Sequence, residues 1–447
     1  MTHAELDENM EPSTHPGHTK MSPQLKKRRY ENSGSLSMPQ RIPLRAHASV
    51  RLRKGIAFST AFEKLSLLEN NLKSLPKILN WRTFALTDLE LSELFSSVSI
   101  GCCSQPEGAD ITEGFKKIHL SETNVHFYRP CEDGALAQQV AVNGDDDEAA
   151  VGSQLWNLPC IEFESIWENL IYDTNLKNDV MSYVYSLVLL SEKGARMTVI
   201  NVNRLILLLG PPGTGKTSLC KGLSQLLSIR MNKRYPRSVM FEINSHSLFS
   251  KWFSESGKLV MKMFDQIDEM SEDKKCMVFV LIDEVESLGM ARESSASRGD
   301  PADSIRAVNA LLTQIDRIRR RENVLVLCTS NLEDCLDRAL LDRADMIQNV
   351  GRPTQRALFS ILSDCISELQ RINIVENDYV IRSGESPDCD EYSQKLWNIA
   401  EKALGLSGRS IRQVPALACS KAYTDFMTLE ECLNYFEEAV TEKLRKA

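Results

Sequence analysis

A glycine-rich turn directly behind a short apolar run is the feature that most constrains the fold of this chain. The run covers residues 205–209, and the turn reads Gly210, Pro211, Pro212, Gly213, Thr214, Gly215, Lys216 and Thr217. This spelling matches the phosphate-loop pattern G-x-x-x-x-G-K-[ST] at every position. We therefore expect a buried strand, a turn whose backbone N–H groups face an anion, and a helix whose positive end points at the same anion.

The chemistry of the turn predicts a nucleoside triphosphate as its ligand. Lys216 is expected to reach the β- and γ-phosphates, and Thr217 is expected to hold Mg²⁺. Ser218 completes the predicted nucleotide-binding residues of the loop. A plain glycine turn is the alternative, but such a turn has no need of a Lys-Thr pair at the start of a helix. A nucleoside triphosphate with Mg²⁺ is therefore the expected ligand.

Further apolar runs predict the fold class. They cover residues 239–243, 277–282, 324–328 and 346–350, and helix-length segments separate them. Continuous apolarity is typical of parallel strands that helices cover on both faces. Beyond Pro353 helical periodicity replaces the strands, and Thr428 and Glu431 form a capping box before the last helix. We predict an α/β core with a doubly wound parallel sheet over residues 156–352 and an α-helical lid over residues 353–447.

The part of the chain before the core divides into three segments by composition. Residues 1–60 are basic and rich in Ser, Pro, His and Gly, which predicts a disordered tail. The tail is interpreted as a nuclear-import signal, a solvated segment or, with least support, an arm that touches nucleic acid. Residues 61–135 predict a small α+β domain, and residues 136–155, with the acidic run 143–148, predict a linker and hinge.

Composition limits the class of protein. The chain has 447 residues, a net charge of -8 and 12 cysteines without a C-x-x-C pair, so neither a zinc knuckle nor a disulfide framework is indicated. It has no run of about eighteen apolar residues and no layout of a secretory signal at its start. We expect an intracellular protein with reduced thiols and no membrane partner.

Polar residues at the ends of two predicted strands indicate hydrolysis. Asp283 and Glu284 follow the run that ends at residue 282, and Asn331 follows the run 324–328. Asp283 is expected to orient the Mg²⁺ shell, and Glu284 to align and deprotonate the attacking water. Asn331 would lie beside the γ-phosphate, where a neutral amide can contact the water. The alternative for each is a solvated turn residue.

The order of phosphate loop, Asp-Glu strand, Thr-Ser-Asn strand and helical lid resembles the AAA+ ATPases, which usually work as rings. The resemblance implies that the nucleotide is ATP. It also implies an arginine that enters the neighbouring subunit's site, and Arg343 is the first candidate, with Arg338 and Arg352 as alternatives. A salt bridge from Arg343 to Asp342 or Asp345 is the structural alternative. A finger of this type supplies roughly 10³ to 10⁵ in rate in GTPases.

The same resemblance assigns residues around the nucleotide and in a central pore. Arg409 corresponds to a second sensor on the lid, and Ile171 and Tyr172 lie in the segment that holds adenine. Core packing is the alternative for these two residues. Lys251, Trp252 and Phe253 stand where AAA+ unfoldases place the side chains that grip a polypeptide, and residues 292–300 are a weaker candidate for a second pore loop.

Four spellings, at residues 249–256, 281–288, 342–345 and 405–409, resemble the pachytene checkpoint protein 2 / thyroid receptor-interacting protein 13 family of AAA+ ATPases. The resemblance implies a homo-hexamer that converts HORMA-domain proteins from a closed to an open conformation, with an adaptor or substrate docked on the N-terminal domain. It also implies work in the nucleus and cytoplasm, on chromosomes in meiosis and in spindle-checkpoint signalling. No direct binding of nucleic acid is expected.

Three other functions share part of the pattern. A clamp loader or a remodeller of nucleoprotein would have basic rather than aromatic pore loops, so Trp252 and Phe253 favour a peptide client. A small-molecule kinase has no use for Asn331, Arg409 or an arginine in trans. A nucleotide-gated scaffold without turnover has no use for Glu284.

Overall fold

The computed structural model describes residues 46–84, 86, 88–102, 105, 107–116, 124–141, 149–196, 199–200, 202–245, 256–287, 302–332, 336–379, 381, 390–422 and 425–446. These residues belong to one compact unit. Among its described helices, none combines the length and the apolarity that crossing a lipid bilayer requires.

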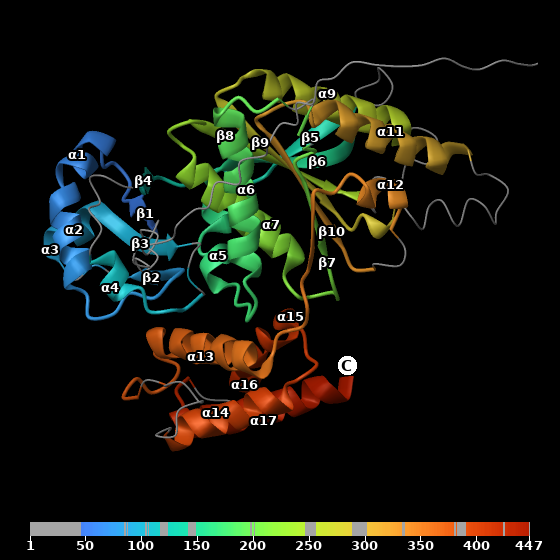
Figure 1. The fold of residues 1–447 in the computed structure, drawn as a ribbon. Helices are drawn as coiled ribbons and strands as arrows, with labels where there is room; N and C mark the ends of the chain where they lie inside the picture. Colours follow the sequence, from blue (N-terminus) through green and yellow to red (C-terminus); the bar gives the residue numbers. More distant parts are fainter. Residues whose placement is uncertain are drawn as a thin grey trace, which may run out of the picture. The chain divides into compact units, whose positions relative to one another are not determined.

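A seven-stranded sheet carries the glycine-rich turn (Figure 1). Five of its strands are parallel: β7 (Leu205–Leu209), β8 (Arg237–Asn244), β9 (Cys276–Asp283), β10 (Val324–Ser330) and β11 (Met346–Asn349). Their order in space is β11-β7-β10-β9-β8. Each predicted apolar run therefore forms a strand, and the predicted α/β class is confirmed. The turn, the Asp-Glu pair and Asn331 all lie at the carboxyl ends of neighbouring strands.

Two antiparallel strands extend this sheet, and the sequence prediction missed them. β6 (Ala149–Leu158) pairs with β8, and β5 (Leu136–Ala141) pairs with β6, in or beside the range that was assigned to a linker. Leu155, opposite Phe241, is buried, and Trp156 donates to Glu242 Oε2 at 2.8 Å. The strands mix small, polar and apolar residues, so the acidic run dominates the composition of this segment. That run, residues 143–148, lies outside the described residues.

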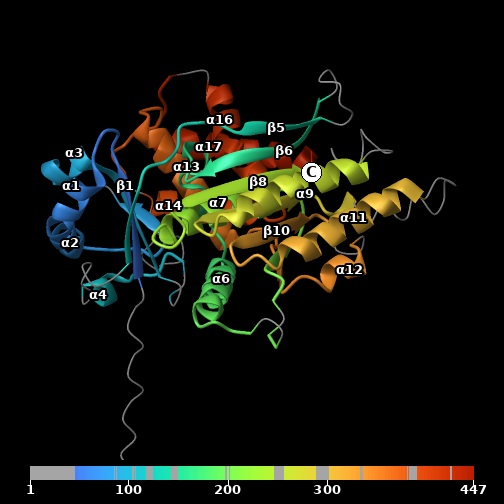
Figure 2. The same ribbon diagram turned by 90° about the horizontal axis from the view of Figure 1, so that it is seen from above.

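Helices cover both faces of the sheet (Figure 2). α9 (Ser256–Glu272) and α11 (Ala302–Ile318) pack on the face that receives Leu205, Leu207 and Leu209. The opposite face receives Ile206 and Leu208 and is covered by three helices: α5 (Ile166–Asn169), α6 (Leu176–Glu192) and α7 (Lys216–Arg230). Both sides of each central strand are therefore buried, which is the physical reason for its uninterrupted apolarity.

The C-terminal part is helical, as predicted. It contains α13 (Gln355–Arg371), α14 (Glu391–Lys402), α15 (Gly408–Ile411), α16 (Val414–Ala422) and α17 (Leu429–Lys446). These helices share a core of their own, in which Leu362, Leu396 and Phe436 are fully buried. The capping box is confirmed, because Thr428 N–H donates to Glu431 Oε2 at 2.9 Å and Glu431 N–H donates to Thr428 Oγ1 at 3.2 Å.

The N-terminal module is a four-stranded sheet in the order β2-β3-β1-β4. Its strands are β1 (Ala46–Leu52), β2 (Arg82–Phe84), β3 (Phe95–Cys102) and β4 (Asn124–Tyr128), and its helices are α1 (Phe58–Glu63), α2 (Leu65–Ser74), α3 (Leu89–Leu94) and α4 (Thr112–Phe115).

Assigning residues 46–60 to a disordered tail was wrong. Ala46, Ala48, Val50 and Leu52 alternate with polar residues and fill the core of the module, a period of two that the basic composition obscured. The remainder of the predicted tail, residues 1–45, lies outside the described residues.

Buried contacts join this module to the helices α5, α6 and α7, although the sequence predicts a hinge between the two domains. The Trp81 side chain is fully buried against Trp167, with ring centroids 5.5 Å apart, and its Nε1–H donates to Asn178 Oδ1 at 3.2 Å. The Arg230 guanidinium, near the end of α7, lies 4.6 Å from the centroid of the Trp81 ring. The helix that begins at the phosphate loop therefore ends against the N-terminal module.

A pair of histidines lies at the same junction. His47 Nδ1 and His126 Nε2 are 3.1 Å apart, and the His47 ring also stacks on Tyr185 of α6. Burial, followed by the nearby charge of Arg230, lowers the pKa of His47 to about 2. Burial, then Arg230 and Lys233, lower the pKa of His126 to about 3, against a weaker opposing effect of Asn232. Both imidazoles are therefore neutral in the folded protein at physiological pH.

We expect the protein to lose stability as the pH falls from 7 to 5. Both folded-state pKa values lie below the ordinary 6.5, so below pH 6.5 the unfolded chain binds more protons than the folded one. The free energy of unfolding should fall by about 2 kcal/mol per histidine at pH 5, and the loss should continue towards the folded pKa values. Urea midpoints at the two pH values, for the native chain and the double variant His47→Gln/His126→Gln, measure this. An equal loss in the double variant would contradict the assignment.

Candidate functional site

Backbone geometry explains why the loop between β7 and α7 needs its glycines. Gly210, Gly213 and Gly215 have φ values of 142°, 77° and 94°, in the region that favours glycine. A Cβ atom on Gly210 would lie 2.2 Å from the carbonyl oxygen of Val350, on the neighbouring strand segment. The loop is therefore free of side chains at the positions where the backbone must turn and approach a ligand.

Lys216 is the buried cation of the site. Its Nζ donates to Gly210 O at 2.7 Å, to Pro211 O at 2.9 Å and to Asn331 Oδ1 at 2.8 Å, which uses all three of its N–H groups. The residue is 5% exposed. Burial lowers the pKa of Lys216, and the nearby carboxylates Glu286 and Asp283 oppose that effect. The first residue of α7 thus connects the loop to the end of β10.

Asp283, the last residue of β9, faces Thr217. Thr217 Oγ1 donates to Asp283 Oδ1 at 2.8 Å, and the Thr329 hydroxyl donates to the same oxygen. Hydroxyl and carboxylate oxygens are the ligands that Mg²⁺ prefers, together with waters and substrate phosphates. In the described part of the chain, no group of three or more His, Cys, Asp and Glu side chains could hold a metal ion without such help. The oxygen pair of Thr217 and Asp283 fits the predicted Mg²⁺ ligands.

Glu284 has a constrained backbone and an available side chain. Its φ is 59°, a left-handed conformation that costs a non-glycine residue about 1–3 kcal/mol. Hydroxyl groups hold the turn in place: Ser245 Oγ and Ser287 Oγ donate to Glu284 O at 2.6 and 2.9 Å. The Glu284 carboxylate makes no hydrogen bond to the described residues, so it can serve as an acceptor for a substrate or water.

Asn331 lies between two charged groups. Its Oδ1 accepts from Lys216, and its Nδ2 donates to Glu286 Oε1 at 2.9 Å. The structure therefore brings Lys216, Asp283, Glu284 and Asn331 to one end of the sheet, as the sequence predicted. Glu286 and Thr329 join them, and neither was foreseen, although each stands within two residues of a predicted site residue.

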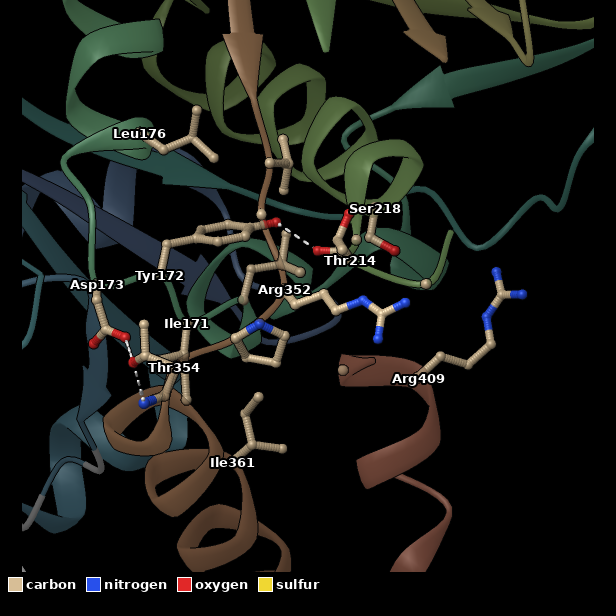
Figure 3. Close-up of a pocket in the computed structure, with 18 of the residues that line it drawn as sticks. Ile171, Tyr172, Asp173, Leu176, Thr214, Ser218, Arg352, Thr354, Ile361 and Arg409 are labelled. Atoms are coloured by element: carbon tan, nitrogen blue, oxygen red, sulfur yellow. Dashed lines mark hydrogen bonds between the residues drawn. The ribbon is translucent and has the colours of Figure 1, made fainter. Parts of the chain in front are cut away.

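A cavity of about 450 Å³ opens beside the loop (Figure 3). Ile171 and Tyr172 lie on one side, Thr214 and Ser218 belong to the loop and α7, and Arg409 of α15 lies on the side of the helical lid. The Tyr172 hydroxyl donates to Thr214 O at 3.5 Å, and burial raises the pKa of Tyr172. The size suits a small-molecule ligand.

The lid touches the phosphate loop directly. The Arg409 backbone N–H donates to Gly213 O at 3.2 Å, and a Cβ on Gly213 would lie 2.7 Å from Ser407 Oγ. Across the cavity, the Thr354 hydroxyl at the start of α13 donates to Asp173. The cavity therefore has walls from the segment before the core, from the core and from the lid, so its shape depends on where the lid sits.

The three candidate arginines differ in their surroundings. Arg343, which follows α12 (Arg338–Leu341), forms a bidentate pair with Asp316 of α11, with Nε–Oδ1 and Nη2–Oδ2 distances of 3.0 and 2.7 Å. The alternative that paired it with Asp342 or Asp345 was wrong about the partner, because Asp345 instead accepts from Tyr183 and from two backbone N–H groups. Arg338 is exposed and has no partner among the described residues. Arg352 lines the cavity and donates to Gly405 O.

Two predicted features lie outside the described residues. They are the aromatic pore loop with Lys251, Trp252 and Phe253, and the second candidate loop at residues 292–300.

Three family models match the N-terminal module, most of the core and the lid. The model of the ATPase family associated with various cellular activities (AAA) matches residues 206–352. The Pch2 N-terminal domain matches residues 43–129, and the TRIP13-like AAA+ ATPase lid C-terminal domain matches residues 354–444.

Individual proteins agree with these models. The putative pachytene checkpoint protein 2 of Caenorhabditis elegans is 54% identical over 421 residues, which cover 91% of this chain and 99% of that relative. The solved structure of C. elegans PCH-2 has a TM-score of 0.78 at 51% identity and covers 90% of this chain and 100% of that one. A chain in the E. coli MS115-1 HORMA:CdnC:Trip13 complex reaches a TM-score of 0.50 at 19% identity, covers 64% of this chain and 94% of that one, and shows the fold alone.

Proposed function

Because the chain belongs to the pachytene checkpoint protein 2 family of AAA+ ATPases, we propose that it uses ATP hydrolysis to convert HORMA-domain proteins from a closed to an open conformation. Membership of this family makes it a nucleotide-binding ATPase. The observation that carries the proposal is the cavity shared by the phosphate loop and the lid, because a nucleotide bound in it contacts both the core and the lid. The HORMA client is supported by family membership and by the HORMA:CdnC:Trip13 complex, whose chain shares the fold.

Each wall of the cavity contacts a different part of ATP in this proposal. The adenine lies against Ile171 and Tyr172, and the phosphates lie in the loop, where Lys216 exchanges carbonyl acceptors for phosphate oxygens. Arg409 reaches the phosphates from the lid. Thr217 and Asp283 would hold Mg²⁺, which neutralises the charge that develops on the phosphates.

Glu284 is the proposed base. Its carboxylate is unpaired among the described residues, and a rigid turn at the end of β9 holds its backbone. It therefore can accept the proton of an attacking water whose position Asn331 helps to set. The strained φ of Glu284 is a further sign of a functional position, because the surrounding hydroxyl groups must maintain it.

We expect Glu284→Gln to bind ATP normally and to hydrolyse it about 10² to 10⁴ times more slowly, because the water loses its base. Nucleotide affinity from fluorescence titration and turnover from phosphate release measure the two effects separately. Glu272→Gln, at the exposed end of α9, is the matched control and should keep its turnover. Native turnover in Glu284→Gln would remove Glu284 from this role.

A ring of subunits, a hexamer in this proposal, lets one subunit complete the site of the next. Arg343 is the proposed trans residue. In the isolated subunit it is held by Asp316 and by Ala339 O, so it would have to leave this pair to reach a neighbour's phosphate. The exposed Arg338, the first residue of α12 and five residues before Arg343, is the natural comparison.

We expect Arg343→Ala to lower turnover by about 10³, the scale of an arginine finger. Mixing it with Lys216→Ala subunits should restore part of the activity, because the second variant lacks a working site but supplies the arginine. Steady-state ATPase rates of the single variants and of their mixtures measure this, and Arg338→Ala, at the alternative candidate, is tested in the same way. If no mixture recovers activity, Arg343 acts within its own subunit as the partner of Asp316.

The client is proposed to be pulled by Lys251, Trp252 and Phe253 in the central pore, while the N-terminal module docks the client or an adaptor. Bulky aromatic side chains grip a polypeptide through apolar contact and need no particular client sequence. Nucleotide state would bias this loop between two positions, as in other nucleotide-driven switches.

We expect Trp252→Ala to keep its ATPase rate within about twofold and to lose remodelling, because the pore loop contacts the client and not the nucleotide. The measurement is release of a labelled partner from a closed HORMA-domain protein, run beside phosphate release. A Trp252→Phe variant, which keeps an aromatic ring, should retain most of the remodelling. Equal loss of both activities in Trp252→Ala would mean that the residue is structural.

A further inference from the structure

A third carboxylate, Glu286, lies inside the site. It stands two residues beyond Glu284 and is 8% exposed, which is unusual for a charged side chain. Its Oε1 accepts from Asn331 Nδ2 at 2.9 Å. Its Oε2 is buried and has no hydrogen-bond partner among the described residues. A buried carboxylate oxygen without a partner carries a considerable cost, so the position calls for a functional reason.

The two neighbours of Asn331 together fix which way its amide faces. An amide has a carbonyl end and an NH₂ end of nearly the same shape, so packing alone does not choose between them. Lys216 can only donate and an ionised Glu286 can only accept. Asn331 Oδ1 must therefore face Lys216, at 2.8 Å, and Asn331 Nδ2 must face Glu286.

Nucleotide binding competes with one of these two constraints. All three N–H groups of Lys216 are in use, on two loop carbonyls and on Asn331 Oδ1. Contact with phosphate oxygens requires Lys216 to give up at least one of these acceptors. If Asn331 is released, Glu286 alone maintains the orientation of the amide, with its oxygen towards the loop.

We propose that Glu286 is a positioning residue for ATP hydrolysis, which holds Asn331 with its carbonyl oxygen directed at the attacking water. The proposal rests on the proposed function of the site and specifies the polarity of one contact in it. The water then donates one hydrogen to Asn331 Oδ1 and the other to the Glu284 carboxylate, so that its lone pair points at the γ-phosphate. Asn331 acts as an acceptor and not as a donor to phosphate.

A simpler role for Glu286 is that of a counter-charge to Lys216. The two roles differ in what they predict. Loss of a counter-charge changes nucleotide affinity, because the net charge around the phosphates changes. Loss of the orienting contact changes the rate of the chemical step at saturating ATP and leaves affinity nearly unchanged.

A reciprocal swap separates the two roles. Asn331→Asp sets one carboxylate against another, so it should lower kcat by about 10², the scale of one lost polar contact to the reacting atoms. Glu286→Gln removes the charge but leaves an amide that tolerates either orientation of Asn331, so kcat should fall only severalfold. In the double variant Glu286→Gln/Asn331→Asp, the new amide at 286 donates to one oxygen at 331 and the other oxygen faces the water. Net charge and shape match the native site.

We expect kcat of the double variant to exceed that of Asn331→Asp by about tenfold or more, a non-additive result that marks a direct coupling. If the two single-variant losses of kcat simply multiply in the double variant, the proposal is overturned. A Glu286→Gln variant that changes only nucleotide affinity would overturn it as well. Glu164→Gln, a partly buried carboxylate paired with Arg51 away from the site, is the matched control and should keep native kcat. If the native protein hydrolyses ATP and Glu284→Gln slows this hydrolysis as expected, the proposed hydrolytic site stands. Failure of the swap then counts against the role of Glu286 alone.

Discussion

The buried ammonium of Lys216 is the interaction on which the rest of the site depends. It stands at the first turn of α7 with three protein acceptors, two from the glycine-rich loop and one from the end of β10. These contacts satisfy a charge that burial would otherwise penalise. They also hold the loop closed around a cation, so an arriving phosphate meets a formed site with a positive centre. The glycines, the strand order and the position of Asn331 all serve this arrangement.

The same arrangement explains how nucleotide can reach distant parts of the chain. The Gly213 carbonyl, inside the loop, accepts from the first turn of α15, and the Tyr172 hydroxyl donates to Thr214. A ligand between these groups contacts the lid, the core and the preceding segment together. At its other end, α7 carries Arg230 against Trp81 of the N-terminal module. One helix thus spans from the phosphate loop to the module proposed to dock clients, which gives a physical route for coupling between them.

The sequence predicted the parts that depend on strong local rules. A short sequence motif is enough to predict the phosphate loop and the capping box at Thr428, and a continuous apolar run is enough to predict each of the five parallel strands. β1 escaped because charged neighbours obscured a short alternating pattern, and β5 and β6 escaped because an acidic run dominates the composition between them. The place of β1 is set by pairing with β3, and that of β6 by pairing with β8, both far along the chain. Glu286 and Asp316 escaped for a similar reason. Glu286 contacts Asn331 and Asp316 contacts Arg343, and both contacts join residues that are distant in the sequence, so no local motif reveals them.

A crystal structure of the Glu284→Gln variant with ATP bound tests the central claim most directly. The account predicts that Lys216 Nζ contacts the β- or γ-phosphate oxygens and has given up at least one of its three present acceptors, while Arg409 faces the same phosphates from the lid. ATP bound elsewhere, or bound at the loop while Lys216 keeps Gly210, Pro211 and Asn331 as partners, would contradict it.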